Sequence, residues 1–263
     1  MARGPVSGIT RKASVPILIF HSLDERGSVI SFSPRAFRHS MAKLHDSGYR
    51  TLSLLQVVNH LHNREPFPLR SLVLTFDDGY RTVYDVAFPA LQQYGMSATV
   101  FLTVGKRKHV ASDDRLPRRE GRAMLNWRQI REINRWGMDI GAHTCTHPDL
   151  TRLPTERIEA EVCSSKTIVE DALGAPVRLF AYPYGRYDAR SRQIAARHFA
   201  CACSDILSLV TQRSDPYALE RVDAYYLRPS RLFDLILTDW FPWYVRARRI
   251  TRGIKRFLMS RMQ

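Results

Sequence analysis

The chain has 263 residues, of which 44% are hydrophobic and 25% charged, as is ordinary for a globular protein with room for a sizeable core. Its 40 Lys and Arg residues outnumber its 25 Asp and Glu residues, and a net charge of +15 is typical of proteins with a polyanionic partner, either nucleic acid or an anionic membrane surface. The apolar runs exclude a membrane-spanning helix, and the run at residues 15–20 is too short for the core of a signal peptide, so we expect a cytoplasmic protein.

Short apolar runs alternate along the chain with segments of helical period. Strands are predicted at residues 17–20, 51–54, 72–76, 98–104, 138–142 and 177–182. Helices are predicted after Ser33, through residues 57–61, and at residues 83–94, 126–136, 154–173 and 187–199. Ser33 before Pro34, and Asn126 three residues before Gln129, are the signals of helix N-caps. The run at residues 72–76 is apolar almost throughout, which is typical of a parallel strand buried on both faces.

The repeated alternation of strand and helix favours a parallel sheet with right-handed crossovers. About seven such units in this length predict an α/β fold, a distorted (β/α)7-type barrel with parallel strands. We divide the chain into an N-terminal extension (1–14), a single domain (15–240) and a basic amphipathic tail (241–263). Within the domain, the basic segment 106–122 lacks periodicity and is expected to be a surface loop.

Asp77 and Asp78 follow the buried strand at residues 72–76 directly, and Gly79 comes next. An isolated charge is costly to bury, so two carboxylates at the end of such a strand need partners. Adjacent side chains point in different directions, which lets one carboxylate bind a metal ion while the other faces a water molecule. A single Asp here would more commonly cap the next helix, but the pair favours a functional site.

His143 and His147 follow the predicted strand at residues 138–142. Two histidines four residues apart face the same side of a helical turn and can offer two imidazoles to one metal ion. Their position supports this interpretation, because sites of parallel barrels form at the carboxyl ends of the strands. With one Asp, they provide the three protein ligands of a zinc-type catalytic centre that keeps a position open for water and substrate.

The sequence TFDDGY at residues 75–80, followed by HTCTHPDL at residues 143–150, resembles the motifs of the polysaccharide deacetylases, the nodulation-protein homology domain of carbohydrate esterase family four. FAYPYG at residues 180–185 is similar to the third motif of that family, and the resemblance extends over residues 15–225. It implies a hydrolase that removes an N-acyl group, above all acetyl, from an amino sugar in a polysaccharide or a lipid-linked glycan. It also implies one divalent metal ion as cofactor, Zn²⁺ or another cation.

The resemblance assigns a role to each residue of the site. Asp77 is expected to be the general base that deprotonates the attacking water. The backbone N–H of Tyr184, which follows Pro183, is expected to help stabilise the oxyanion. The expected metal ligands are Asp78, His143 and His147.

Two positions depart from the family pattern. Ala181 stands where the third motif usually carries an Arg that orients the base, and Arg178 or Arg221 could replace that Arg. The usual C-terminal strand before the general-acid His is missing, whereas residues 17–20 and His21 are similar to the start of the circularly permuted branch, typified by poly-N-acetylglucosamine deacetylases. His21 is then expected to protonate the leaving amine, although a His after an apolar strand is more commonly a hydrogen-bonded core residue.

The tail begins with aromatic residues and becomes strongly basic, with no acidic residue after Asp239. One helical stripe contains Trp243, Ala247, Ile250, Ile254, Phe257 and Leu258. This composition is typical of an interfacial amphipathic helix, so we expect residues 243–263 to bind an anionic membrane surface, which would place the protein on the inner face of the membrane. A last helix docked on the barrel and a frayed basic end are the alternatives.

Other functions remain open beside the leading one. A deformylase of a lipid-linked formamido sugar would use the same residues. A catalytically inactive carbohydrate-binding barrel would have no use for a base at Asp77. Nucleic acid is not an expected partner, because no nucleic-acid-binding motif accompanies the charge, and an amino-sugar glycan is the expected substrate.

Overall fold

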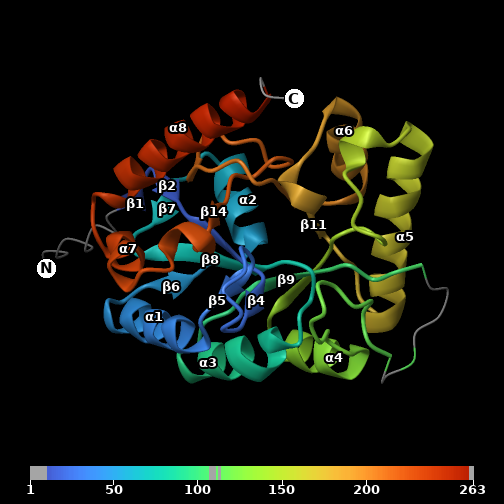
Figure 1. Ribbon diagram of the computed structural model, residues 1–263, viewed down its shortest axis with the longest axis horizontal. Coiled ribbons are helices and arrows are strands. Elements are labelled where there is room, and N and C mark those ends of the chain that lie inside the picture. The colour runs from blue at the N-terminus through green and yellow to red at the C-terminus, as the bar shows by residue number, and fades with distance from the viewer. Residues whose placement is uncertain (1–10, 107–110, 112–113, 261–263) are drawn as a thin grey trace, which may run out of the picture.

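The computed structural model describes residues 11–106, 111 and 114–260, and the side chains of residues 13–106, 111 and 114–253. At its centre lies a curled sheet of parallel strands surrounded by helices (Figure 1). The strands of this sheet are β3 (Ile17–Phe20), β6 (Arg50–Thr51), β8 (Ser71–Phe76), β9 (Thr99–Leu102), β10 (Asp139–Ala142), β11 (Leu179–Ala181), β12 (Cys201–Cys203) and β14 (Val222–Asp223). Their order is β12-β11-β10-β9-β8-β3-β14, and β6 pairs with the beginning of β8.

Smaller pairs of strands and a series of helices complete the domain. The pairs are β1 (Arg11–Lys12) with β7 (Phe67–Pro68), β2 (Ser14–Val15) with β13 (Val210–Thr211), and β4 (Ser22–Leu23) with β5 (Ser31–Phe32). The α-helices are α1 (Pro34–Asp46), α2 (Leu54–His62), α3 (Phe88–Gln93), α4 (Trp127–Arg135), α5 (Thr155–Leu173), α6 (Ala189–His198), α7 (Ser230–Phe233) and α8 (Phe241–Ser260). Shorter turns are η1 (Val83–Ala87), η2 (Leu150–Arg152), η3 (Pro183–Gly185), η4 (Ala224–Leu227) and η5 (Asp234–Leu237).

The alternation of side chains along the strands divides the core into two hydrophobic clusters. On β3, Leu18 and Phe20 pack in the larger cluster with residues of the outer helices, whereas Ile17 packs in the smaller cluster on the other face. Helix α2 contributes the apolar side of its surface to the smaller cluster and lies inside the ring of the other helices (Figure 1). Burial on both faces is why the central strand β8 is apolar almost throughout, and all six of its residues are buried.

The predicted fold class is confirmed, since the strands are parallel and the sheet curls into a partial barrel. The predicted N-caps at Ser33 and Asn126 are also present, and Asn126 forms a capping box with Gln129. The predicted helix at residues 83–94 differs, because it starts as the π-helical turn η1 before α3. Pro89 at the start of α3 has no backbone N–H to continue an α-helical ladder, and the N–H of Phe88 bonds instead to the carbonyl of Val83, five residues back.

The tail forms the long helix α8, and its beginning packs against the rest of the domain. Phe241 and Val245 are each only 3% exposed. This side of the helix is therefore docked on the domain, as the alternative prediction had it. Of the predicted apolar stripe, the described side chains of Trp243, Ala247 and Ile250 are exposed. The side chains of Ile254, Phe257 and Leu258 lie outside the described residues. Among the described helices, none is long and apolar enough to cross a membrane, and the predicted segment boundaries stay predictions.

Candidate active site

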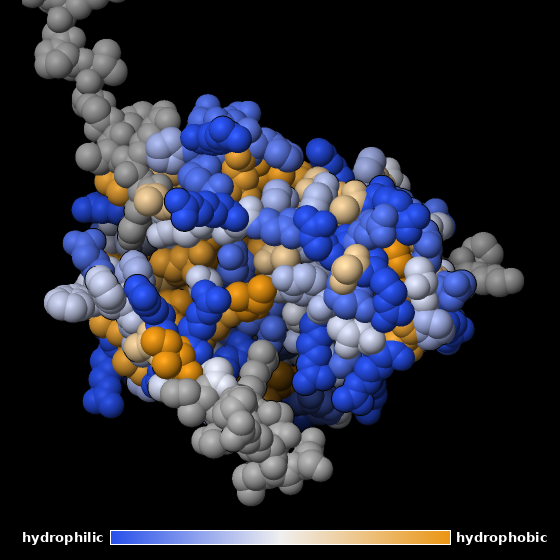
Figure 2. Space-filling view, turned by 90° about the horizontal axis from the view of Figure 1, so that it is seen from above, coloured by the Kyte–Doolittle hydropathy of each residue, from blue (hydrophilic) through white to orange (hydrophobic). Residues whose placement is uncertain are grey.

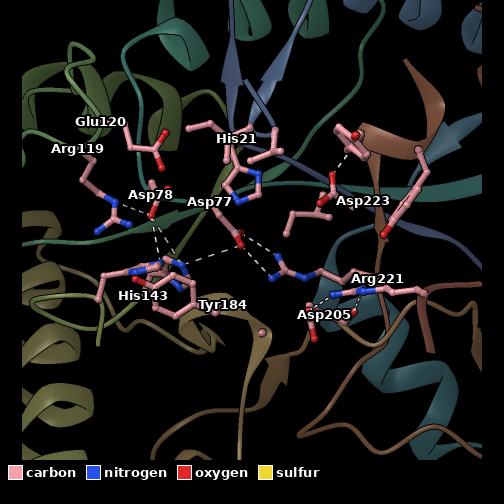
Figure 3. A pocket seen from close by; sticks show the side chains of 18 residues that line it. His21, Asp77, Asp78, Arg119, Glu120, His143, Tyr184, Asp205, Arg221 and Asp223 are labelled. Carbon is pink, nitrogen blue, oxygen red and sulfur yellow. Dashed lines mark hydrogen bonds and ion pairs between the residues drawn. The ribbon is translucent and has the colours of Figure 1, made fainter. Parts of the chain in front are cut away.

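Six of the seven predicted site residues meet at the carboxyl ends of the strands and line one pocket of about 430 Å³ (Figure 3): His21, Asp77, Asp78, His143, His147 and Tyr184. The seventh, Pro183, is buried and does not line this pocket. The register of β3 and β8 places Phe20 beside Phe76, so the next residues, His21 and Asp77, are neighbours across the sheet. The backbone N–H of Asp77 donates to the carbonyl of Phe20 at 2.9 Å. The sheet therefore brings together residues that are distant in sequence, as the strand-end rule predicts.

Asp78, His143 and His147 converge on one point at the bottom of this pocket. One ligand atom from each lies within 4.8 Å of the others, and all three residues are buried. Asp78 Oδ1 is 3.5 Å from His147 Nε2 and 3.9 Å from His143 Nε2. Ligands of a tetrahedral ion with bonds of about 2.1 Å lie roughly 3.4 Å apart, so the arrangement matches a site for a divalent metal ion.

The two histidines converge by a different route from the helical turn that their spacing predicts. Residues 143–149 form an irregular loop in which Thr144 and His147 have φ angles of 64° and 58°. The Thr144 hydroxyl accepts a hydrogen bond from the N–H of His147 at 2.9 Å and stabilises this turn. Such left-handed angles are costly for residues with a side chain, and they also occur at Asp78 and Tyr184, which line the pocket.

A carboxylate from helix α5 holds the histidine loop in place. Glu161 is 5% exposed, and its Oε2 accepts hydrogen bonds from the N–H groups of Cys145 and Thr146 at 2.9 and 2.8 Å. Its Oε1 accepts a third bond from the hydroxyl of Thr146 at 2.8 Å. Cys145 is buried, burial raises the pKa of its thiol to about 12, and it does not belong to the cluster formed by Asp78, His143 and His147.

The protonation of the histidines suits metal binding. His143 Nδ1 lies 2.7 Å from the carbonyl of Ala181, and because a carbonyl only accepts, this nitrogen is the donor and Nε2 is free to bind a metal ion. Burial lowers the pKa of His143 to about 4 and that of His147 to about 3, so both rings are neutral near pH 7. Asp78 Oδ1 has an ion pair with Arg119 Nε at 3.0 Å but no hydrogen bond among the described residues, so a metal ion would compete with Arg119 for this oxygen.

Asp77 has a different partner from its neighbour. Both oxygens of its carboxylate accept hydrogen bonds from Arg221, at 2.8 and 2.9 Å, and Arg221 is 1% exposed. Burial by itself raises the pKa of Asp77, but the guanidinium outweighs this effect, and the pKa falls to about 2. Arg221 thus occupies the role expected of the Arg missing at Ala181, whereas Arg178 is exposed next to the start of β11.

His21 projects into the same pocket, close to Asp77 and Asp223 (Figure 3). Strand β14 pairs with β3 on the side away from β8 and places Asp223 beside Ile19, two residues before His21. Burial raises the pKa of Asp223, and the nearby imidazole of His21 opposes this rise. The position of His21 between two carboxylates is compatible with a proton-donating role.

The segment 106–122, expected to be a surface loop, folds over the pocket where it is described. Arg119 Nε approaches Asp78 Oδ1 at 3.0 Å, and both Arg119 and Glu120 line the pocket. The buried Leu116 packs so closely on Gly79 that a Cβ at that glycine would lie 2.5 Å from Leu116 Cδ1. The sequence of this segment has no periodicity that would predict its position over the pocket, and its one leucine, Leu116, was the only signal.

Arg122 attaches the same segment to the residues that follow β3. It is 6% exposed and binds Asp24 Oδ2 at 2.8 Å, with further hydrogen bonds to the hydroxyls of Ser28 and Ser31 at 2.7 and 2.9 Å. These groups lie after β3, the strand that His21 follows directly. The segment is therefore tied to the strand end that supplies the candidate proton donor.

The third motif supplies the opposite side of the pocket. Tyr184 is 57% exposed, its φ angle is 57°, and its ring centroid lies 4.6 Å from that of His147, while Pro183 is buried beneath it. Gly185 follows at φ 62°, and a Cβ there would come within 2.1 Å of the Asp205 Cβ, so only glycine fits. Asp205 and Arg252, which also line the pocket, were not among the predicted site residues.

Comparison with known proteins agrees with this geometry. A family model described as polysaccharide deacetylase matches residues 64–199, more than half of the chain. The Bacillus subtilis (strain 168) protein YxkH is 28% identical over 71% of this chain and 62% of its own length. The poly-β-1,6-N-acetyl-D-glucosamine N-deacetylase of Escherichia coli (strain K12) is 32% identical over 48% of this chain and 20% of its own length. The chain thus spans less than two thirds of these relatives.

A solved structure supports the fold. The Streptococcus pyogenes deacetylase PplD in complex with acetate superposes with a TM-score of 0.71 at 27% sequence identity. The superposition covers 81% of this chain and 92% of that chain. The curled parallel sheet and its surrounding helices are therefore shared with a deacetylase over most of both chains.

Proposed function

The chain belongs to the polysaccharide deacetylase family, and on that premise we propose that it hydrolyses the N-acyl amide, usually N-acetyl, of an amino sugar in a glycan. The observation that supports this proposal is that one pocket contains both a candidate metal site and a candidate general base. A cluster of three ligand groups lies next to an ionised carboxylate that is fixed by a buried guanidinium. A carbohydrate-binding protein without activity would need neither group.

Asp78, His143 and His147 would hold the divalent ion, and their mixed nitrogen and oxygen donors favour Zn²⁺, although other divalent cations suit them too. Once bound, the ion supplies a Lewis acid that polarises the acyl oxygen. The hydrogen bond from His143 Nδ1 to the carbonyl of Ala181 orients the ring, so that Nε2 faces the other two ligand groups.

The remaining residues move the protons of the reaction. Arg221 keeps Asp77 ionised and oriented. Asp77 takes a proton from the attacking water while the water oxygen forms a bond to the acyl carbon. The backbone N–H of Tyr184, held beside Pro183, donates to the oxygen that gains negative charge. His21 gives a proton to the nitrogen as the carbon–nitrogen bond breaks, which releases the free amine and a carboxylate.

Acetate release from short N-acetylglucosamine oligomers tests this proposal directly. Purified protein with Zn²⁺ should release acetate, and a chelator should stop the release. Asp77→Asn should lose most of its activity, whereas Asp85→Asn, the same substitution at an exposed position on η1, should keep full activity. Wild-type protein that binds metal yet releases no acyl group from any acetylated or formylated amino sugar would contradict the proposal.

We propose an anionic membrane surface as a second partner, contacted through residues 243–263. In support, Trp243, Ala247 and Ile250 form an exposed row on α8, with the exposed Arg246 and Arg249 at its side. Each basic residue near an anionic surface adds roughly 1 kcal/mol of attraction, and aromatic side chains favour the interface. Location on the inner face of the membrane, and the permuted order of the motifs, stay predictions.

Cosedimentation with phosphatidylglycerol vesicles tests the membrane contact. Deletion from Pro242 is a poor test, because it also removes the buried Val245. The double change Arg246→Glu and Arg249→Glu is sharper and should release the protein from the vesicles. The matched control is Arg35→Glu with Arg38→Glu, two exposed positions on α1, and equal release by both pairs would contradict a specific role of α8.

A further inference from the structure

Helix α8 forms part of the wall of the candidate active site. Arg252, on its inward side, lines the pocket, donates to the carbonyl of Asp205 at 2.8 Å and pairs with the carboxylate of the same residue. About two turns earlier in the helix, the hydroxyl of Tyr244 donates to the carbonyl of Tyr226 at 2.5 Å, and Tyr226 also lines the pocket. The helix is therefore attached to the pocket at two points.

The outward side of the same helix is apolar and uncovered. Trp243 and Ile250 are 63% and 57% exposed and lie, with Ala247, opposite the buried Phe241 and Val245 on the helical surface. Arg246 and Arg249 occupy one flank of this exposed row. Figure 2, which looks down on the side of the molecule where α8 lies, shows hydrophobic patches set among hydrophilic residues.

The rim of the pocket carries exposed apolar side chains as well. Of the eight large hydrophobic residues that are exposed among the described side chains, three line the pocket and three lie on α8 or directly before it: Val29, Tyr184, Tyr225, Trp240, Trp243 and Ile250. Single exposed hydrophobic residues are ordinary, but a concentration around one site marks an interaction surface. We name this set of six residues the rim surface.

We propose that the rim surface rests on an anionic lipid bilayer while the pocket receives the amino-sugar head group of a lipid carried in that bilayer. This inference rests on the proposed deacetylase function and adds its substrate class, a lipid-borne amino sugar. The charge of α8 is complementary to an anionic surface, because the sequence has no acidic residue after Asp239. Tryptophan and tyrosine, which supply four of the six residues, are the side chains that favour the membrane–water interface.

The arrangement has a kinetic consequence. A protein held on the bilayer meets a lipid-borne substrate at a raised effective concentration, because protein and substrate are then confined to the same surface. The pocket wall and the docking helix are one element, so contact through the outward side of α8 holds the pocket within about one helix diameter, roughly 10 Å, of the head groups. We expect kcat/KM on the lipid-borne substrate to exceed that on a soluble analogue at least about tenfold.

The experiment compares one N-acetylglucosaminyl phosphate head group in two forms, on a soluble short-chain linker and on a long-chain lipid in phosphatidylglycerol vesicles. Wild-type protein should show the advantage of the vesicle form. The double variant Trp243→Ser with Ile250→Ser should lose that advantage and keep the wild-type rate on the soluble form. Leu69→Ser, at an exposed apolar position outside the rim surface, is the matched control and should behave as wild type.

Other results of this experiment would contradict either the bilayer inference or the proposed function. If the double variant keeps the vesicle advantage, or if wild type has none while it hydrolyses the soluble form, the bilayer inference is wrong. If gel filtration shows that the double variant separates a dimer into monomers, the rim surface joins two copies of the chain instead. If no protein hydrolyses either form, the proposed function fails, and loss of cosedimentation in the double variant alone would still establish the docking surface.

Discussion

At the scale of single residues, the two adjacent carboxylates differ because their partners differ. Asp77 meets a buried guanidinium that keeps it ionised and fully hydrogen-bonded. Asp78 turns through a left-handed φ of 72° toward two neutral imidazoles. The strained backbone at Asp78 directs the side chains of consecutive residues to different partners, which suits the proposed roles of Asp77 as base and Asp78 as metal ligand.

This division of labour predicts opposite results for two substitutions. Asp77→Asn should lower turnover by about 10²–10⁴-fold, the usual contribution of a general base, and leave the bound metal content unchanged. His147→Ala should lose both metal and turnover, because it removes one of three ligands. Metal analysis beside acetate release measures the two effects, and equal metal loss in both variants would show that the carboxylates are not divided in this way.

The depressed pKa of Asp77 predicts a pH dependence of stability in the metal-free protein. The folded pKa of about 2 is below the ordinary value of 3.8, so ionised Asp77 contributes stability above about pH 4 and this contribution is lost as the pH falls toward 2. The pH-dependent part amounts to about 2 kcal/mol. Urea unfolding with chelator present should show the advantage of wild type over Asp77→Asn shrinking from pH 5 to pH 3, and a constant difference would contradict the Arg221 pairing.

At the scale of elements, the loops after the strands are fixed by groups from other elements. Helix α5 supplies Glu161 to the histidine loop, and the segment before α4 supplies Arg122 to the loop after β3. Both groups are buried and make several hydrogen bonds, so they restrict loops that have no regular structure of their own. We expect the geometry of the proposed metal site to depend on Glu161, which holds the loop that carries its two histidines.

Glu161 is therefore expected to control metal affinity from outside the cluster. Glu161→Ala leaves the N–H groups of Cys145 and Thr146 without this acceptor, and the loss costs about 1–3 kcal/mol at the buried Cys145 and less at the exposed Thr146. We expect the Kd for Zn²⁺, measured against a competing chelator, to rise about 10–100-fold. Glu161→Gln should recover part of the affinity, and Glu156→Ala, an exposed carboxylate on the same helix, should have no effect.

If Glu161→Ala lowers stability but leaves the Kd for Zn²⁺ at the wild-type value, the loop is held by other contacts. The fold would then tolerate the loss without moving His143 or His147. The metal titration separates the two outcomes, because a purely structural loss would change the melting temperature alone.

At the scale of the whole molecule, the pocket draws on nearly the full length of the chain, from His21 to Arg252. The parallel sheet makes this possible, since each strand ends at the same edge. Helix α8 closes one side of the pocket and carries basic residues on its outer flank, so part of the net charge of +15 lies next to the site. Stability of the fold and occupancy of the site should therefore be linked.

Metal removal is expected to lower the melting temperature of the whole domain. A ligand present at about 100 times its Kd stabilises the folded state by about 2.7 kcal/mol. For a chain of this size each kcal/mol shifts the melting temperature by about 2–4 °C, so chelator should lower it by about 5–10 °C. His147→Ala should show no such shift, and an equal shift in that variant would mean that the chelator acts elsewhere.

The sequence by itself determined the fold class, the strand ends and the main groups of the cluster. Mainly apolar runs such as residues 72–76 and 138–142 mark parallel strands, and the polar residues directly after them must lie at the common edge of the sheet, so Asp77, Asp78 and His143 could be located without coordinates. His147 lies in the same cluster as Asp78 and His143, but the predicted helical turn was wrong, because the two histidines lie in an irregular loop with left-handed residues that Glu161 holds.

Only the tertiary structure decided which polar side chains pair across the molecule. Arg221 binds Asp77 from 144 positions away, and Arg252 binds Asp205 from 47 positions away. Such pairs have no local periodicity, because they depend on where distant strands and helices pack and not on the spacing of neighbouring residues. For the same reason the sequence identified α8 as amphipathic, while packing decided that Phe241 and Val245 face the domain and Trp243 and Ile250 face outward.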